Sequence, residues 1–551
     1  MRKNKFLKTL SIGLALTLII AATNSNNRYF EIAKNIEIYS AIFKTVNEIY
    51  VDDVNPNHLL NTSVKSMLSK LDPYTVYISE DKIEDYRTLS TGQYGGIGAS
   101  TVRIKGQVFI SSVVEGGPAD KAGIEVGDEV ISASGIAVLN KSNEALNQLV
   151  RGQAKTTLKL GIRKNGTNST TSISVVRDKI TIKNVPYYGL LEQNVGYIKF
   201  TQFTENGGRN INKALKELKK EGATSLIIDL RGNLGGLLHE AVNICNLFIP
   251  KDKLVVETKG KRPENSTQFK TLNQPVDLKI PVIILVNSSS ASASEIVAGT
   301  LQDYDRAVIL GQKSYGKGLV QNVRPLTYNA QLKVTIAKYY TPSGRCIQAL
   351  DYTHRNEDGS VGKVADSLKT TYKTAGGRTV YDGGGVDPDV IMKDEKWPPI
   401  IIKLVQEGKI YLFANKFKLE NKTIPTPTDF ELTDAQFNDF VSWVSELNFE
   451  IKNKIETSLD NLENIAERSN TTELFNATMT ELKNEVHQSI ESQLINEQPL
   501  LKTILEAEIA LRYYNEGGGI ETSLADDEEI GRAIDLLNNP TEYKALLKSS
   551  I

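Results

Sequence analysis

The sequence runs Leu226-Ile227-Ile228-Asp229-Leu230-Arg231-Gly232-Asn233-Leu234-Gly235-Gly236 into a helical pattern from about Leu237 to Phe248. The same order recurs nearby, because the apolar run Val282 to Val286 leads into a helical pattern from Glu295 to Tyr304, and Gly196 to Phe200 is a further strand. Apolar runs that alternate with amphipathic helices are typical of a sheet buried between helices. Residues 195–325 therefore predict an α/β domain with a largely buried sheet.

Different patterns flank this α/β segment. Apolar residues recur at helical spacing from Ile32 to Tyr50 and again from Leu59 to Leu71, which predicts a small helical N-terminal unit. Residues from about 92 to 178 are short β-rich runs separated by glycine turns, and they predict a compact β-rich module. Beyond about 400 the sequence is helical and charged. Because 551 residues exceed what one core usually organises, we expect several domains.

The charge balance limits the class of binding partner, and the cysteine content limits the expected disulfides. Lys and Arg total 65 against 66 Asp and Glu, a formal net charge of −1, so the chain lacks the basic footprint of a nucleic-acid-binding protein and a polypeptide partner fits better. Two cysteines, Cys245 and Cys346, form no disulfide framework in so long a chain and are interpreted as buried thiols.

The first residues predict export. Basic residues at positions 2, 3, 5 and 8 precede an apolar stretch from about Leu10 to Ala22, which is short for a membrane span. We interpret residues 1–23 as a signal peptide or a membrane anchor, and the sequence leaves both open. The expected location is periplasmic or anchored to the outer side of the cytoplasmic membrane.

A serine-rich turn is the first candidate for chemistry. Residues 287–295, Asn-Ser-Ser-Ser-Ala-Ser-Ala-Ser-Glu, join a buried strand to a helix, as in a nucleophile elbow, where backbone N–H groups and the helix dipole meet a developing oxyanion. The alternative is a loop whose hydroxyls merely cap the helix. Local sequence does not choose among the five serines.

The base for such a serine is not an obvious histidine. The four histidines are His58, His239, His354 and His487, and none is compelling. Lys317 lies between two glycines after the strand 307–310, and it can act as a base if burial lowers its pKa towards neutrality. The alternative is an ordinary solvated lysine.

Two glycine loops complete the pattern. Gly311, Gly316 and Lys317 match the phosphate-loop spacing, but the next residue is Gly318 rather than Ser or Thr, and residues 318–325 do not read as a helix, so we reject nucleotide binding. The loop from Asp229 to Gly236 would supply backbone N–H donors to an oxyanion hole beside the serine loop.

Taken in order, these segments resemble the carboxyl-terminal processing proteases, also called tail-specific proteases, which are Ser-Lys peptidases with an inserted PDZ domain. The resemblance covers about residues 30–392. It is carried by Leu71-Asp72-Pro73-Tyr74-Thr75, Tyr94-Gly95-Gly96-Ile97-Gly98, Gly117-Pro118-Ala119, Ala122-Gly123-Ile124, Gly127-Asp128, Asp229 to Asn233 with Gly235-Gly236, Ser292-Ala293-Ser294-Glu295, Gly316-Lys317-Gly318 with Gln321, Tyr340 to Arg345, and Gly385-Val386-Asp387-Pro388-Asp389.

The resemblance implies a role for several residues. The nucleophile falls on Ser292 and the general base on Lys317. Gln321 matches the residue that orients the lysine; it lies four positions after Lys317, which predicts one face of a strand or helix, and Asp303 is the less favoured orienter. The oxyanion donors are the backbone N–H groups of Ala293 and Gly235, with Gly236 as an alternative to Gly235. The loop Gly96-Ile97-Gly98 resembles one that grips a peptide carboxylate with its N–H groups while the peptide adds a strand to the sheet.

The expected architecture is an α/β multi-domain chain with a crotonase-like protease core. We assign residues 27–87 to the helical N-terminal region, 88–180 to the PDZ domain, 181–395 to the Ser-Lys core and 396–551 to a helical tail without an inherited role, which could form homo-oligomers. The expected reaction is hydrolysis of peptide bonds in proteins recognised through their free C-termini, through an acyl-enzyme, with no metal and no organic cofactor. The alternatives are a catalytically inactive PDZ peptide-binding scaffold and a structural export factor.

Overall fold

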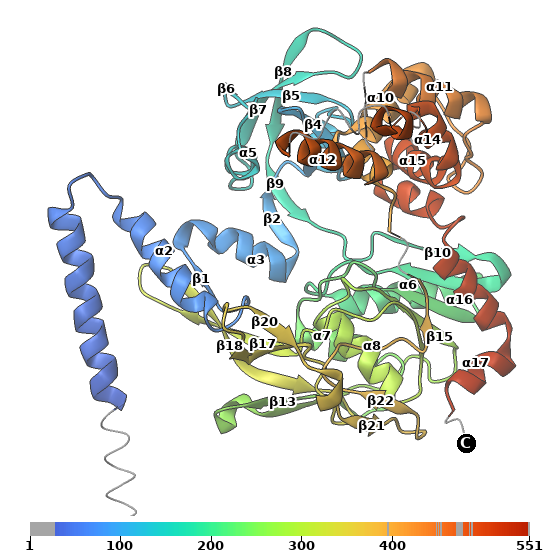
Figure 1. Cartoon of the computed structure of the whole chain (residues 1–551). Coiled ribbons are helices and arrows are strands. Elements are labelled where there is room, and N and C mark those ends of the chain that lie inside the picture. Colours follow the sequence, from blue (N-terminus) through green and yellow to red (C-terminus); the bar gives the residue numbers. More distant parts are fainter. Residues whose placement is uncertain are drawn as a thin grey trace, which may run out of the picture. The chain divides into compact units, whose positions relative to one another are not determined.

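The computed structural model describes residues 28–393, 396–447, 449, 451, 454–469, 478–483, 485 and 489–548 (Figure 1). The predicted signal peptide or anchor, residues 1–23, lies outside this part. The chain divides into two compact units, one up to Tyr77 and one from Ile78 onward. In the part of the chain that the structure describes, no helix is both long enough and apolar enough to cross a membrane.

The first unit is helical, as the periodicity predicts. A helix covers residues 28–49, and α2 (Pro56–Ser69) follows, with the Asn55 side chain accepting a hydrogen bond from the His58 N–H and Pro56 at the first helical position. The strand β1 (Val76–Ile78) comes next.

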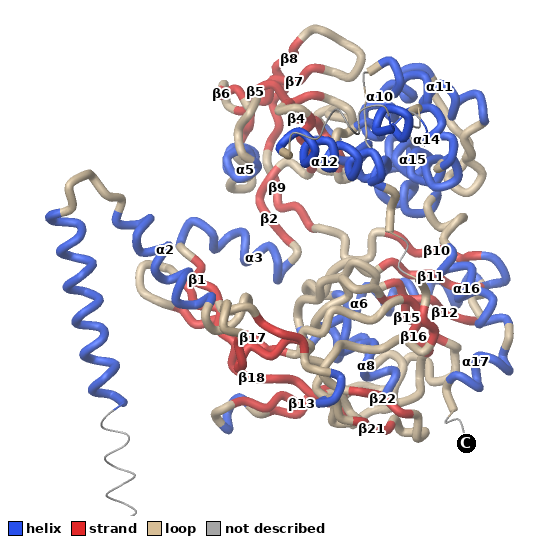
Figure 2. The backbone as a smooth tube through the Cα atoms, viewed as in Figure 1, coloured by secondary structure: helices blue, strands red, loops and turns tan. Residues whose placement is uncertain are grey.

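The α/β core is built on a sheet in the order β10-β11-β12-β15-β16-β23 (Figure 2). Strands β11, β12, β15, β16 and β23 pair in parallel, whereas β10 is antiparallel to β11. The elements are β10 (Tyr187–Leu191), β11 (Val195–Lys199), α6 (Gly207–Glu221), β12 (Ser225–Asp229), α7 (Leu238–Cys245), β15 (Val282–Val286), α8 (Ala293–Asp303), β16 (Val308–Gly311) and β23 (Val390–Ile391).

Alternate residues of the strands enter two separate cores. One face of the sheet packs with α6, α7 and α8 through Ile198, Leu226, Ile228, Ile284, Leu215, Ala241 and Ile296. The other face packs with two late helices, α16 (Glu528–Asn538) and α17 (Pro540–Leu546), through Tyr197, Ile227, Ile283, Leu285, Ile530, Leu536 and Tyr543. Burial on both faces explains why these strands are continuously apolar in sequence.

A second, antiparallel sheet supports the lysine loop. β18 pairs with both β13 and β17, and β13 also pairs with β14. The strands are β13 (Leu254–Gly260), β14 (Thr267–Lys270), β17 (Leu319–Pro325) and β18 (Gln331–Tyr340). Residues 319–325 form a strand and not a helix, in agreement with the rejection of a phosphate loop. Short ladders follow, formed by β19 (Leu350–Arg355) with β20 (Val361–Lys363) and by β21 (Thr371–Lys373) with β22 (Thr379–Tyr381).

The β-rich module has its own sheet and core. Its sheet runs β3-β4-β5-β7-β8, with β3 at one edge, and a separate ladder joins β2 to β9. Its elements are β2 (Gln93–Gly96), β3 (Ala99–Ile104), β4 (Gln107–Val113), α4 (Pro118–Lys121), β5 (Glu129–Ala133), β6 (Ile136–Ala137), α5 (Asn143–Val150), β7 (Thr157–Arg163), β8 (Thr170–Val176) and β9 (Asp178–Thr181), preceded by α3 (Ile83–Thr91).

The residues after 396 are helical, but they pack in two separate cores, which the sequence did not predict. Helices α9 (Pro399–Gln406), α10 (Lys409–Glu420), α11 (Asp434–Glu446), α14 (Ile490–Asn496) and α15 (Gln498–Thr522) share a hydrophobic core, and α12 (Lys454–Arg468) also belongs to this region. A capping box formed by Thr433 and Gln436 begins α11. By contrast, α16 and α17 cover one face of the core sheet. The reason is that the apolar face of that sheet needs a second helical layer.

Candidate active site

The serine turn is a strained elbow between β15 and α8. Ser292 has φ 56° and ψ −111°, a combination that side-chain-bearing residues rarely adopt, and it immediately precedes the first residue of α8. Such strain is found where a nucleophile must stand at a sharp strand-to-helix turn.

The structure separates the five serines that sequence could not rank. Ser288 and Ser289 are exposed. The hydroxyls of Ser290 and Ser294 are buried and donate to the carbonyl oxygens of Leu230 and Asn233, both at 2.8 Å. Ser292 is half-buried at the start of the helix, the position that the resemblance assigns to the nucleophile.

Lys317 lies in a loop that is held closely on both sides. Its side chain is half-buried, and the loop connects β16 to β17. A Cβ on Gly316 would stand 2.4 Å from the Ala349 Cβ, and one on Gly318 would stand 2.8 Å from the Gln348 N, so a larger residue would collide at either position. The two glycines therefore let the loop pass against residues 348–349.

One buried carboxylate, that of Glu295, contacts both halves of the predicted dyad. Its Oε2 accepts hydrogen bonds from the backbone N–H groups of Ser292 and Lys317, both at 2.8 Å. Its Oε1 accepts from the Ser314 hydroxyl and the Gly316 N–H, both at 2.6 Å. Sequence reasoning quoted Glu295 only as part of a motif, although Ser-x-x-Glu is also the pattern of a capping box and could have drawn attention to it.

The hydroxyl of Tyr339, on β18, makes a second connection. It contacts the carbonyl oxygens of Ser292, at 3.2 Å, and of Lys317. The Tyr339 N–H also donates to the Gly318 carbonyl at 3.0 Å. Nothing in the sequence pattern pointed to this tyrosine, because its role depends on how β18 folds back against the lysine loop.

The glycine loop lies against the elbow, and the N–H group of one of its two candidate donors is already hydrogen-bonded. A Cβ on Gly235 would stand 2.9 Å from the Ser292 Cβ, so the two loops touch. The Gly235 N–H donates to the Asn233 side chain at 2.9 Å, so this N–H is already used. Within the described part of the chain, the Gly236 and Ala293 N–H groups have no hydrogen-bond partner. The geometry therefore favours Gly236 over Gly235 as the loop's oxyanion donor.

Gln321 and Asp303, the two residues predicted to orient Lys317, lie in different places. Gln321 lies on β17, where its amide donates to the Thr335 hydroxyl at 3.1 Å, and a bulge between Val320 and Gln321 breaks the alternation on which the four-residue spacing argument relied. Asp303 is at the far end of α8 from Ser292 and forms a buried ion pair with Arg345 at 2.9 Å, so the suggestion that it orients the lysine is wrong. His239 is an exposed helical side chain beside Glu240.

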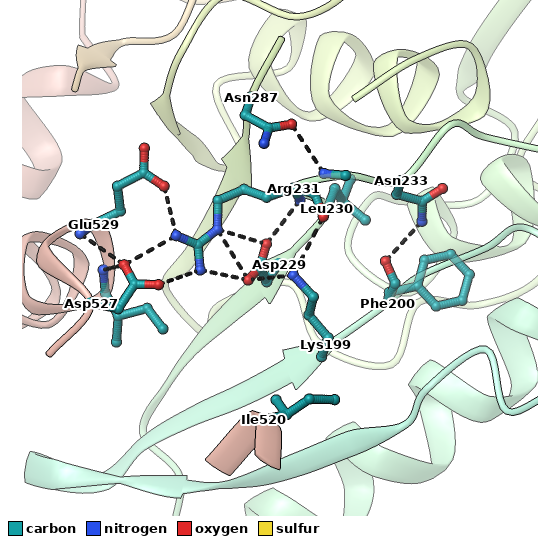
Figure 3. Close-up of polar contacts among 12 residues, drawn as sticks. Lys199, Phe200, Asp229, Leu230, Arg231, Asn233, Asn287, Ile520, Asp527 and Glu529 are labelled. Atoms are coloured by element: carbon teal, nitrogen blue, oxygen red, sulfur yellow. Dashed lines mark hydrogen bonds and ion pairs between the residues drawn. The ribbon is translucent and has the colours of Figure 1, made fainter. Parts of the chain in front are cut away.

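A buried charge cluster anchors the start of the glycine loop (Figure 3). Asp229 accepts hydrogen bonds from Lys199 at 3.0 Å and from the Arg231 guanidinium at 2.7 Å. Burial acts to raise the Asp229 pKa, but Arg231 and Lys199 outweigh it and hold this pKa well below its ordinary value. The other side of the guanidinium pairs with Asp527 and Glu529 at the beginning of α16, both at 2.7 Å.

The predicted carboxylate-binding loop of the β-rich module is buried and anchored by its carbonyls. The Ile97 carbonyl accepts from the Ala119 N–H and the Gly98 carbonyl from the Val114 N–H, both at 2.8 Å. Gly98 has φ +73°. A cleft of about 490 Å³ adjoins the loop, and its lining includes Val114, Pro118 and Ile180, which surround Gly98.

Among the described residues, no group of three or more His, Cys, Asp or Glu side chains could hold a metal ion.

Comparison with known proteins agrees with this arrangement. The model of Peptidase family S41 matches residues 194–354, that of the PDZ domain matches 95–175, and that of the probable PDZ-protease C-terminal helical domain matches 400–537. The chain is 35% identical over 352 residues to the carboxy-terminal-processing protease of Bartonella bacilliformis, covering 62% of this chain and 79% of that protein. It is 31% identical to the carboxy-terminal processing protease CtpA of Bacillus subtilis, covering 62% and 73%. A solved structure, the photosystem II D1 C-terminal processing protease, matches at 24% identity over 65% of this chain and 93% of that one, with a TM-score of 0.35.

A strained serine elbow, a glycine loop and a PDZ domain define a serine-type peptidase. The chain belongs to Peptidase family S41, among the carboxy-terminal processing proteases. This membership confirms the predicted family and excludes the alternative that the protein is a structural export factor.

Proposed function

We propose that Ser292 is the nucleophile of this peptidase and that neutral Lys317 is its general base. The observation that carries the proposal is that a single oxygen of Glu295 accepts hydrogen bonds from the backbone of both residues, which places them side by side. Ser292 Oγ attacks the carbonyl carbon of the scissile peptide while Lys317 Nζ takes the hydroxyl proton. The lysine then gives this proton to the leaving amine, and water hydrolyses the acyl-enzyme.

The oxyanion that forms during attack needs preorganised donors. We assign this role to the N–H groups of Ala293 and Gly236, at the start of α8 and on the glycine loop. Ala293 is the first residue of α8, so the helix dipole adds to its donor strength. Gln321 remains our candidate for orienting Lys317, since it lies on β17, the strand that follows the lysine loop.

The substrates are proposed to be polypeptides with free C-termini, bound by the PDZ domain through Gly96, Ile97 and Gly98. The edge position of β3 supports this, because a peptide can add to an unpaired strand edge. We further propose that the chain is exported, either to the periplasm or to the outer side of the cytoplasmic membrane, and that its core shares the crotonase arrangement, for which the parallel strands and following helices are the support.

The test of the dyad is labelling and cleavage. The purified protein is treated with a fluorophosphonate probe, and the labelled peptide is identified; cleavage of an unfolded test protein is followed in parallel. Ser292→Ala should abolish both, and Lys317→Ala should abolish cleavage with the fold retained. Activity should rise with pH as Lys317 loses its proton. Unchanged cleavage by either variant would overturn the assignment.

A separate experiment tests the PDZ proposal. Calorimetry compares a peptide with a free carboxylate and its C-terminal amide, both added to the full-length Ser292→Ala protein. The amide should bind more weakly by about 1.5–3 kcal/mol, as expected for a lost hydrogen bond to a charged group. Equal affinities would remove carboxylate recognition and leave the dyad standing.

A further inference from the structure

We propose that Glu295 and Tyr339 are the positioning residues of the active site, which hold the backbones of Ser292 and Lys317 in register from two sides. This inference rests on the proposed Ser-Lys chemistry and extends it to residues that touch neither substrate nor reacting atoms.

The need for such residues follows from where the dyad lies. Ser292 begins a helix, whereas Lys317 belongs to a separate loop between two glycines. Glycine is the residue whose backbone has the most conformational freedom, and a serine and its base must meet within about 3 Å. A displacement of about 1 Å can cost roughly 100-fold in rate. The lysine loop therefore has to be fixed relative to the elbow.

Glu295 provides the first connection. Because its Oε2 lies 2.8 Å from the N atoms of both Ser292 and Lys317, these two nitrogens are separated by no more than twice that distance. Its Oε1 holds Ser314 and Gly316, the residues on the N-terminal side of Lys317. One side chain thus fixes the elbow and three positions of the lysine loop together.

These four contacts also favour the ionised form of Glu295. All four partners are donors, two to each oxygen, and they fill the acceptor positions of a carboxylate. Both partners of Oε2 are backbone N–H groups, so a proton on that oxygen would point at a donor. Full burial raises the Glu295 pKa, and the four donors reduce this rise by stabilising the charged form but do not cancel it. The connection is therefore strongest when Glu295 is ionised.

Tyr339 provides the second connection, on the carbonyl side. Its hydroxyl lies between the carbonyl oxygens of Ser292 and Lys317, and the residue is 1% exposed. Glu295 therefore joins the N–H groups of the same two residues, and their carbonyl oxygens share the single O–H hydrogen of Tyr339. Contacts to both the donors and the acceptors of these backbones restrict rotation as well as separation.

The main test replaces each bridge with the smallest change. Glu295→Gln substitutes an NH2 group for one oxygen and sets donor against donor, and Tyr339→Phe removes only the hydroxyl. We expect kcat to fall about 100-fold for Glu295→Gln and about tenfold for Tyr339→Phe, with KM nearly unchanged. The double variant should lose less than the product of the two effects, because both act on one unit.

Matched controls separate positioning from general stability. Glu240 is also a buried carboxylate that accepts from two backbone N–H groups, those of Asn206 and Gly208, and Tyr543 also places a buried hydroxyl against a backbone, at Val282. Glu240→Gln and Tyr543→Phe should lower the unfolding midpoint, yet leave the rate of fluorophosphonate labelling close to that of the unaltered protein.

The pH profile of labelling supplies a readout that a purely structural role would not change. In the unaltered protein the labelling rate should rise with pH as Lys317 becomes a base, whereas in Glu295→Gln this rise should flatten because the lysine no longer reaches the hydroxyl. If Glu295→Gln fails to fold, Tyr339→Phe carries the test. A normal rate and profile in the folded variants, or an equal loss of rate in the controls, overturns the inference. If Ser292→Ala remains active, the proposed chemistry itself fails.

Discussion

The ion pairs between Arg231 and helix α16 lead to the first prediction, which concerns how the end of the chain supports the active site. The perturbation is the double substitution Asp527→Asn and Glu529→Gln, which keeps the shape of both side chains and removes their charges. Arg231 is the second residue after β12 and opens the glycine loop, so these two acids connect α16 to the loop that carries the proposed oxyanion donor (Figure 3).

The expected magnitude follows from burial and charge balance. The side chains of Arg231, Asp527 and Glu529 are 16%, 19% and 14% exposed, so the pairs lie between surface contacts and fully buried ones. Surface pairs contribute about 0–1 kcal/mol, and breaking a buried pair costs about 3–5 kcal/mol. After the substitution Lys199 and Arg231 share only Asp229. We expect α16 to lose about 2–4 kcal/mol of docking free energy.

Limited trypsin digestion measures this loss, because α16 contains Arg532 as a cleavage site. When opening is fast relative to cleavage, the digestion rate follows the open population, so 2 kcal/mol corresponds to roughly 30-fold faster release of the C-terminal helices. We also expect kcat/KM to fall by about tenfold, through the loosened glycine loop. Asp434→Asn is the control, since it removes an exposed ion pair with Lys502 and should change neither quantity.

A double-mutant cycle with Arg231→Met shows whether Asp527 and Glu529 act through Arg231. In the Arg231→Met background, neutralising Asp527 and Glu529 should have almost no further effect on digestion or activity. Equal effects in both backgrounds, or an unaltered digestion rate in the double variant, would refute this reasoning.

Three further predictions concern other contacts. Gly235→Ala should lower the fluorophosphonate labelling rate more than 100-fold, because its Cβ would stand 2.6 Å from the Ala291 carbonyl oxygen, whereas Gly232→Ala, with a similar positive φ and open space, should cost far less. Comparable losses at the two glycines would contradict this. Because the Asp229 pKa is lowered in the folded protein, its stabilisation is present above the ordinary aspartate pKa of about 3.9 and is lost as pH falls below it, so urea unfolding of Asp229→Asn should depend less on pH between 5 and 3. An unchanged pH dependence would exclude this contribution. Tyr411→Phe removes a 2.7 Å hydrogen bond from α10 to the Ile110 carbonyl, so the contact between the C-terminal helices and the PDZ domain should lose about 1 kcal/mol. Urea unfolding followed by the fluorescence of Trp397 and Trp443 should show a lower midpoint. An unchanged midpoint would contradict this prediction.

Much of the fold could be predicted because the central strands of the core sheet are mostly apolar. Runs such as 226–228 and 282–286 are buried on both faces, so no alternation obscures them, and the helices that follow have clear periodicity. The elbow and the glycine loop could be located for the same reason, since each directly follows such a strand.

What could not be predicted depends on contacts between distant parts of the chain. The spacing of Lys317 and Gln321 suggested one shared face, but a bulge in β17 removes that inference, and bulges leave no reliable mark in a single sequence. Tyr339 acquires its role only when β18 lies beside the lysine loop. The split of the C-terminal helices depends on an uncovered sheet face that local periodicity cannot reveal.

The second helical layer of the core has a consequence for biogenesis. The strands that precede the serine elbow and the glycine loop leave one apolar face uncovered until α16 and α17 pack on it. Those helices are translated long after Lys317, so a nascent chain carries both residues of the proposed dyad before this layer can form. We therefore expect proteolytic competence to require the packing of α16 and α17 on this face, which would delay self-cleavage while unfolded segments of the chain are most exposed.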